Sequence, residues 1–469
     1  MAQMTGGSVE TNTNYDPKVN YNGPLAVITT LFFMWGFITS MNDILIPKLK
    51  AVFNLNYTEA IFIQFTFFAA YFIISLIYYI ISVTKGDPIL KIGYKNAIVI
   101  GLVISAVGSI MFYPAAETLQ YPLFLGAFFV LASGVTILQI GANPYVSLLG
   151  KPETSSSRLN LTQAFNSLGT TLAPIVGSYL IFKSVANDAG ADAVKGPYIG
   201  IAATLIVLAV IIKLFNLPQV SKDENDITDT SVSIFKYKHL VLGVFGIFAY
   251  VGAEVAIGSF LVNFLAEDNI AGFTHEQASL YLSMYWGGAM VGRFFGAIFL
   301  ADLTKQKRNL YLLIIGVLSL GYAYWVTDQE LNLAIIFVAL VLVNLVAFYI
   351  GKNKANRTLA VFSGIVIIAL LIGVFGTGHI AMWAIITIGL YNSVMFPNIF
   401  TLAIKNLGDN TPKGSSLLVM AIVGGAIIPL IQGMLADALG VQLSYLLPII
   451  CYAYLMYYGI KGYEVKKPV

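Results

Sequence analysis

The chain has 469 residues, of which 58% are hydrophobic and only 10% are charged. Soluble proteins carry roughly 25% charged residues, because charged side chains cover a globular surface, so this composition excludes an ordinary soluble enzyme. The net charge of +3 is too small to indicate a nucleic-acid-binding surface, and the single cysteine, Cys451, cannot form a disulfide within the chain. The three histidines lie far apart, so we expect no cofactor and no histidine-based metal site.

Apolar segments of helical length follow one another along the chain. A membrane-spanning helix needs about 20 mostly apolar residues, whereas the strands of a membrane β-barrel are about half as long and alternate polar with apolar residues. The sequence therefore predicts an all-α membrane protein with about fourteen spans. We expect these spans at about residues 24–47, 59–84, 96–114, 121–149, 158–182, 197–217, 238–266, 275–301, 309–327, 331–350, 358–377, 380–404, 415–438 and 442–460.

Lysine and arginine residues indicate the orientation of the chain, because they stay on the cytoplasmic side of a membrane. With a cytoplasmic N-terminus, most of the 26 lysine and arginine residues fall in cytoplasmic segments. The exterior segments then contain only Lys48, Lys50, Lys183 and Lys195. We therefore expect both termini to lie in the cytoplasm.

The two halves of the chain are related by an internal repeat, as in many transporters. The first spans of the two halves begin near residues 24 and 238, an offset of about 214 residues. The matching prolines Pro174 and Pro429, however, lie 255 residues apart. The excess of about 40 residues is the length of two spans, which predicts an inserted transmembrane hairpin at about 303–352. We expect a disordered cytoplasmic tail at 1–22, an N-terminal six-helix bundle at 23–218, a cytoplasmic linker at 219–236, a C-terminal bundle that includes the hairpin at 237–461, and a cytoplasmic tail at 462–469.

Two acidic residues, Asp43 and Glu254, lie within predicted spans. A charge at membrane depth costs at least about 2.5–3.5 kcal/mol, which indicates a function. A carboxylate that faces a water-filled cavity can bind Na⁺ through its oxygen atoms or accept a proton, so both residues are candidates for coupling to a cation, and Na⁺ is the only metal we consider. The alternative for Asp43 is local hydrogen bonding at a helix end. The alternative for Glu254 is a structural hydrogen bond to a neighbouring helix.

Side-chain amides form stripes on two successive predicted spans. Gln139 and Asn143 share one helix face, and Asn160, Gln163 and Asn166 follow on the next span. Amides both donate and accept hydrogen bonds, as a sugar ligand requires, while aromatic rings give its C–H face a platform. We therefore expect a substrate cavity here, although any single amide could instead hold two helices together. Further candidate substrate-binding residues are Trp35, Asn392 and Gln432.

Arg293 lies toward the predicted cytoplasmic end of the span at 275–301, and Asp302 follows that span. Because a charge this deep in the membrane needs a partner, we expect Arg293 to form part of a cytoplasmic gate. Its predicted partner is Asp302 or the basic loop that follows.

Several segments between about residues 30 and 440, outside the hairpin, are specific enough to indicate a family; they include LFFMWGFITSMNDILIP, RLNLTQAFNSLGTTLAP and YNSVMFPNIFTLAIKNLG. They resemble the fucose–galactose–glucose symporter family of the major facilitator superfamily, nearest to its bacterial glucose/galactose branch. The resemblance implies a 6+6 major facilitator fold, alternating access and cation-coupled uptake of a monosaccharide. It also implies that Asp43 matches a coupling aspartate, that Gln163 and Asn166 match sugar-contacting amides, and that Gln139 replaces a glutamate of the fucose branch.

These observations predict a symporter, and not an enzyme, that imports a hexose together with Na⁺ or H⁺, with glucose or galactose before fucose. We expect a monomer in a bacterial inner membrane, whose partners are a monosaccharide, the coupling cation and the lipid bilayer. The alternatives are a symporter for fucose or another monosaccharide, a drug-type exporter, and a sugar sensor on the same fold. The amide stripes disfavour the exporter, and the short cytoplasmic segments disfavour the sensor.

Overall fold

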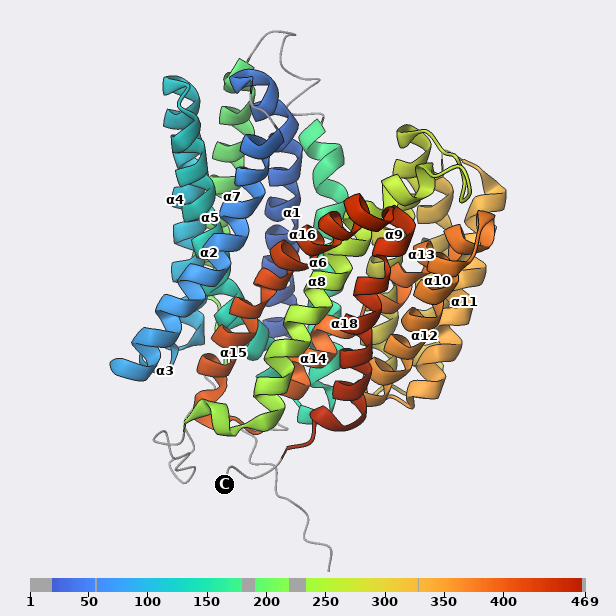
Figure 1. Ribbon diagram of the computed structural model, residues 1–469. Coiled ribbons are helices and arrows are strands. Elements are labelled where there is room, and N and C mark those ends of the chain that lie inside the picture. Colours follow the sequence, from blue (N-terminus) through green and yellow to red (C-terminus); the bar gives the residue numbers. More distant parts are fainter. Residues whose placement is uncertain (1–18, 55–56, 179–189, 219–232, 328, 466–469) are drawn as a thin grey trace, which may run out of the picture.

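The computed structural model describes residues 19–54, 57–178, 190–218, 233–327 and 329–465 (Figure 1). Within these ranges every regular element is a helix, which confirms the predicted all-α class. Most of the two tails, predicted at 1–22 and 462–469, and most of the linker predicted at 219–236 lie outside the described residues.

The described part of the chain before the linker contains six long helices, coloured blue to green in Figure 1. α1 packs along α6, and α4 packs against both α5 and α7. The short helix α3 (Pro88–Ile92) joins α2 to α4, and the carboxylate of Asp87 caps it by accepting hydrogen bonds from the backbone N–H groups of Ile89 and Leu90. The long helices are α1 (Asn22–Phe53), α2 (Tyr57–Thr84), α4 (Tyr94–Thr118), α5 (Tyr121–Leu148), α6 (Ser155–Ser178) and α7 (Lys195–Leu214).

The part of the chain after the linker contains more helices, coloured yellow-green to red in Figure 1. α8 packs against α14, α16 and α18, while α13 packs against α9 and α12. The predicted span at 380–404 is divided at Ser393 and Val394, and the span at 415–438 is divided by the turn η6 (Ala421–Val423). The helices are α8 (Lys238–Ala266), α9 (His275–Phe299), α10 (Lys305–Val326), α11 (Leu331–Gly351), α12 (Ala355–Phe375), α13 (Gly378–Asn392), α14 (Met395–Ala403), α15 (Thr411–Met420), α16 (Gly424–Leu439), α17 (Val441–Ser444) and α18 (Leu446–Tyr457).

Twelve helical segments of the described chain are long and apolar enough to cross a membrane. The protein is therefore a multi-pass membrane protein, but this number is smaller than the fourteen spans predicted from the sequence. The difference lies in α6 and α9, which have 24 and 25 residues but contain no stretch apolar enough to count as a membrane span. Both carry polar side chains that lie inside the protein, such as Asn160 and Gln163 on α6, and these lower the hydropathy of the whole helix.

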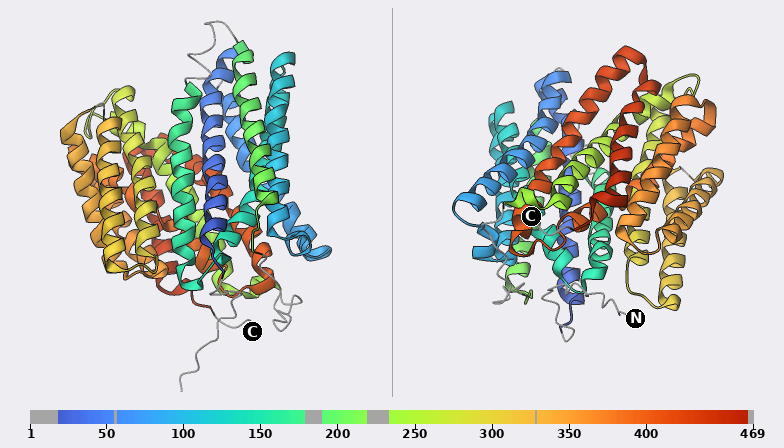
Figure 2. Two further views of the ribbon diagram at one scale, coloured as in Figure 1. Left: turned by 180° about the vertical axis from the view of Figure 1, so that it is seen from behind. Right: turned by 60° about the horizontal axis from the view of Figure 1, so that its bottom comes forward.

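The hairpin predicted at about 303–352 corresponds to α10 and α11, which lie at the outer edge of the second half (Figure 2). α10 packs against α9, and α11 packs against α9 and α12. The Phe348 ring stacks on Phe299 with centroids 5.1 Å apart, and the Tyr322 hydroxyl donates to the Ser283 carbonyl at 3.0 Å. Leu313 on α10 remains 66% exposed. The outer face of the hairpin is therefore apolar, as expected for a surface in contact with lipid.

The two halves contact each other directly near the N-terminal end of α6. The hydroxyls of Ser156 and Thr401 are 2.6 Å apart, and the Ser157 hydroxyl donates to the Ala297 carbonyl at 2.6 Å. All three hydroxyl-bearing residues are buried. Short polar side chains allow helices of the two halves to approach closely while their hydrogen bonds remain satisfied.

Candidate functional site

A cavity of about 150 Å³ lies between the two halves of the chain. One wall comes from α1, α2, α5 and α6, and the other from α8, α9, α14 and η6. Cavities at such a junction are where transporters of repeated architecture bind their substrates. The lining residues are Trp35, Tyr71, Gln139, Gln163, Tyr250, Val251, Glu254, Arg293, Phe396 and Ile422.

The wall from the first half presents amides beside aromatic rings. Gln139 on α5 is 1% exposed, and neither atom of its amide has a hydrogen-bond partner within the described chain. Leaving a buried polar group unpaired costs about 1–3 kcal/mol, so this amide is a strong candidate for pairing with a bound molecule or with water. Gln163 on α6 and the Trp35 ring on α1 complete this polar and aromatic surface.

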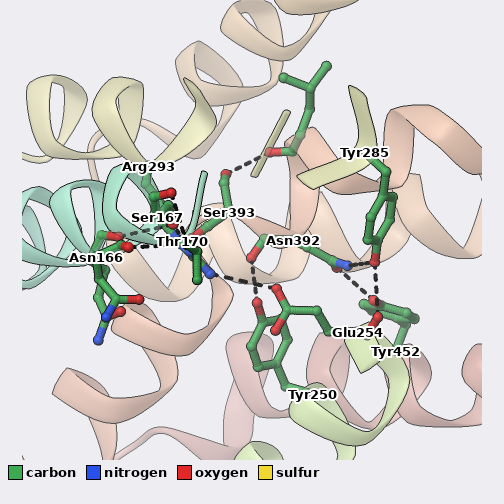
Figure 3. A network of polar contacts seen from close by, with 12 residues as sticks. Asn166, Ser167, Thr170, Tyr250, Glu254, Tyr285, Arg293, Asn392, Ser393 and Tyr452 are labelled. Carbon is green, nitrogen blue, oxygen red and sulfur yellow. Dashed lines mark hydrogen bonds and ion pairs between the residues drawn. The ribbon is translucent and has the colours of Figure 1, made fainter. Parts of the chain in front are cut away.

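The opposite wall contains an ion pair, shown in Figure 3. The Arg293 Nη2 atom on α9 lies 3.6 Å from the Glu254 Oε1 atom on α8, and both side chains are mostly buried. The Arg293 Nε donates to the Ser393 carbonyl at 3.1 Å, and Nη1 donates to the hydroxyl of Ser167 on α6. Arg293 therefore joins the two halves at the cavity and balances the charge of Glu254.

Next to this ion pair, three tyrosines form a hydrogen-bond network around Asn392 (Figure 3). The Asn392 amide nitrogen donates to the Tyr285 hydroxyl at 2.8 Å, and its amide oxygen accepts from the Tyr452 hydroxyl at 2.6 Å. Tyr285 in turn donates to the backbone carbonyl of Glu254 at 3.2 Å, and Tyr250 donates to the Asn392 carbonyl at 3.0 Å. The network fixes the part of α8 that carries Glu254.

The structure brings only some of the sequence-predicted residues to the cavity. Asn143 is buried and does not line the cavity, and its side-chain amide has no hydrogen-bond partner among the described residues. Asn166 donates to the Phe32 carbonyl of α1 at 3.0 Å. Asn392 is held by the tyrosines, and the Gln432 amide nitrogen donates to the Ser444 hydroxyl at 3.3 Å. The Asp43 side chain lies outside the described residues, although its backbone belongs to α1.

Several lining residues were not among those predicted from the sequence: Tyr71, Val251, Phe396 and Ile422. Tyr71, Val251 and Ile422 lie in segments in which most neighbours are also apolar, so no local pattern separates cavity-facing from lipid-facing positions. Within the described residues no group of three or more histidine, cysteine, aspartate or glutamate side chains could hold a metal ion.

The expected pairing of Arg293 with Asp302 differs from what the structure contains. The two residues are nine positions apart on and after α9, which is about 13 Å along a helix. Side chains on a helix point toward its N-terminus, so Arg293 extends away from Asp302 and toward Glu254. Asp302 instead pairs with Lys151, whose Nζ lies 2.9 Å from its Oδ2, at the surface between the halves.

The Lys151–Asp302 pair is sensitive to acid and to salt. The hydrogen bond and the charge of Lys151 lower the pKa of Asp302 below its ordinary value, so the contact is present at neutral pH and is lost as the pH falls below the ordinary aspartate range, about 4. We expect Asp302→Asn to speed hydrogen exchange in the segment 151–158 at neutral pH, and salt of about 1 M to remove the difference, because such salt screens exposed pairs. A difference that persists in high salt would contradict this assignment.

The comparisons with known proteins agree with this architecture. The family model of the Major Facilitator Superfamily matches residues 28–351. A glucose/galactose transporter of Brucella abortus is 48% identical over 97% of this chain and 98% of its own length. A putative glucose/galactose transporter of Helicobacter pylori is 42% identical over 94% of this chain and 97% of its own length. The L-fucose-proton symporter of Escherichia coli is 30% identical over 92% of each chain.

Solved structures agree as well. A crystal structure of the E. coli fucose:proton symporter aligns with a TM-score of 0.74 and 28% identity over 95% of this chain and 99% of that chain. These similarities confirm the family resemblance inferred from the sequence motifs. The chain therefore belongs to the Major Facilitator Superfamily, and it is a transporter and not an enzyme.

Proposed function

We propose that this protein is a cation-coupled symporter that imports a hexose, with glucose or galactose as the preferred substrate, by alternating access. The observation that carries the proposal is the cavity between the halves, where the unpartnered amide of Gln139 and the ring of Trp35 face the Glu254–Arg293 pair. A sugar supplies hydroxyl groups for the polar atoms and a C–H face for the ring. The names of the Brucella and Helicobacter relatives support a hexose.

The proposed substrate contacts come in two groups. Trp35, Gln139 and Gln163 contact the sugar from the first half. The side chains of the other predicted residues do not line the cavity in this conformation, because they contact other protein groups or lie next to the cavity. We propose that they contact the sugar when the two halves rearrange. These residues are Asn143, Asn166, Asn392 and Gln432.

The proposed coupling groups are the two carboxylates of Asp43 and Glu254, which take up the co-transported Na⁺ or H⁺. Asp43→Asn should abolish concentrative uptake while it leaves part of the sugar exchange across the membrane, because exchange needs no ion gradient. Glu254→Gln should change the dependence of uptake on the ion. Full accumulation by the Asp43 variant would remove that residue from the coupling site, and an unchanged ion profile would do the same for Glu254.

We also propose that the protein has fourteen spans in two bundles at 23–218 and 237–461, with the hairpin inserted between α9 and α12. The protein lies in a bacterial inner membrane, and both termini are in the cytoplasm. The contacts of α6 with α1 and α9 support the two additional spans, because a polar helix enclosed by neighbouring helices is shielded from lipid.

Cysteine labelling tests this topology. The background is Cys451→Ser, which removes the chain's only cysteine. An impermeant maleimide applied to intact cells should label Glu330→Cys, at the hairpin turn, and should not label Lys354→Cys, at the end of the hairpin. Both positions are exposed in the structure, so equal labelling of the two from outside would refute the proposed hairpin.

The decisive experiment for the function is uptake of labelled glucose into proteoliposomes under an inward Na⁺ gradient or an inward H⁺ gradient. Galactose, fucose and mannose serve as competitors. We expect one gradient to drive accumulation and galactose to compete. Stronger competition by fucose than by galactose would favour the fucose symporter, which the similarity to the E. coli protein makes the second candidate. No sugar uptake under either gradient would refute the substrate class.

A further inference from the structure

The Glu254 carboxylate lines the cavity, and one of its oxygen atoms, Oε1, accepts no hydrogen bond from the described residues. The residue is 9% exposed. An ionised carboxylate accepts hydrogen bonds and donates none. Glu254 is therefore complementary to a donor on the bound molecule.

Arg293 holds this acceptor in place. Its guanidinium lies 3.6 Å from the carboxylate, and separate contacts to Ser393 and Ser167 fix it from two directions. The Tyr285 hydroxyl holds the backbone carbonyl of Glu254 at 3.2 Å. A binding group whose neighbours fix its position discriminates between ligands more sharply than a mobile one does.

The wall across the cavity makes a different demand on the ligand. By hydrogen-bond geometry, neither the N–H₂ group nor the oxygen of the Gln139 amide has a partner in the described part of the chain, so the amide can bind a hydroxyl as donor and as acceptor. A molecule that spans the cavity must therefore present a hydroxyl donor to Glu254 and a second hydroxyl to Gln139. A hexose ring carries hydroxyls on neighbouring carbons and satisfies both walls.

We propose that Glu254, positioned by Arg293, accepts a hydrogen bond from one particular hydroxyl of the sugar and thereby sets which hexose is transported. This inference rests on the proposed function and adds to it: the sequence predicts only an ion-coupling role for Glu254 and a gating role for Arg293. In addition to these roles, the pair forms a specificity element in the sugar site. A charged acceptor strengthens recognition, because hydrogen bonds to charged groups exceed neutral ones.

The test is sugar exchange in proteoliposomes with no ion gradient, which separates sugar recognition from ion coupling. Unlabelled 1-, 2-, 3-, 4- and 6-deoxyglucose compete with labelled glucose. In the unmodified protein, removal of one hydroxyl should weaken competition by about 10- to 100-fold, the effect of losing a hydrogen bond to a charged group. In Glu254→Gln, unlabelled glucose itself should compete less well. Removal of the hydroxyl that Glu254 binds should then weaken competition by only a few-fold, while the effect of removing each other hydroxyl should stay the same.

A purely structural role for Glu254 gives another pattern, because it would weaken all sugars alike and keep the ratios between them. Arg293→Lys is a second variant, which keeps the positive charge but loses the planar guanidinium with its several hydrogen-bond donors. It should reduce the loss of competition caused by removing the same hydroxyl. Glu330→Gln, an exposed change of the same chemistry in the hairpin turn, is the matched control and should leave every ratio unchanged.

The outcomes separate this inference from the proposed function. Exchange of glucose with unchanged deoxy-sugar ratios in both variants would overturn the role of the pair and leave the transporter assignment intact. The unmodified protein alone can also overturn it, since a series without any tenfold penalty excludes a charged acceptor for one hydroxyl. No exchange of glucose, galactose or fucose by the unmodified protein would refute the substrate class and this inference together.

Discussion

Replacing Arg293 by glutamine should abolish sugar uptake and destabilise the protein by about 3–5 kcal/mol, because the change leaves the Glu254 carboxylate buried without its counter-charge. Both side chains are mostly buried, so salt in solution screens the isolated charge poorly. The variant also loses the contacts to Ser167 and Ser393, which connect the cavity wall to α6 and to the break between α13 and α14. Thermal unfolding in detergent and sugar exchange in proteoliposomes measure the two effects.

The matched control is the double variant Arg293→Gln with Glu254→Gln, which removes both charges. Replacing both members of a buried pair avoids the isolated charge, so we expect stability to return to within about 1–2 kcal/mol of the unmodified protein. Transport should remain impaired, since the cavity has lost its charged acceptor. A double variant no more stable than Arg293→Gln alone would show that the ion pair is not the origin of the loss.

The second large effect is expected where α1 and α6 cross. A Cβ atom on Gly36 would lie 1.9 Å from the Asn166 carbonyl oxygen, and one on Gly169 would lie 2.2 Å from the Phe33 carbonyl oxygen. Both neighbours are backbone atoms, so the helices would have to separate. Gly36→Ala should destabilise the protein by about 3 kcal/mol, the upper end for an overpacked interior.

Transport should suffer as well, because Trp35 precedes Gly36 and lines the cavity together with Gln163 of α6. A displacement of about 1 Å in a binding site can lower a rate by about 100-fold, and we expect a loss of this order in uptake. Gly200→Ala is the control, since a Cβ there has nothing within 4 Å. Equal behaviour of the two variants in unfolding and uptake would contradict the close crossing of α1 and α6.

The sequence alone determined the membrane-embedded all-α class and the family. Both depend on local information: apolar runs long enough to span a bilayer, and motifs read directly from the chain. It also identified Glu254 as a candidate functional residue, because a charge within an apolar span is costly wherever its partner lies. Similarly, the amide stripes pointed to Gln139 and Gln163 before their surroundings were known.

Only the tertiary structure decided which polar residues face the cavity and which partners they have. Gln139 and Asn143 share a helix face, yet only Gln139 reaches the cavity, since the position along the helix matters as much as its face. Arg293 pairs with Glu254, 39 positions earlier, and not with nearby Asp302, because its side chain points toward the start of α9 and α8 packs there. Such contacts join helices far apart in the sequence, and the pattern within one helix does not specify its neighbour.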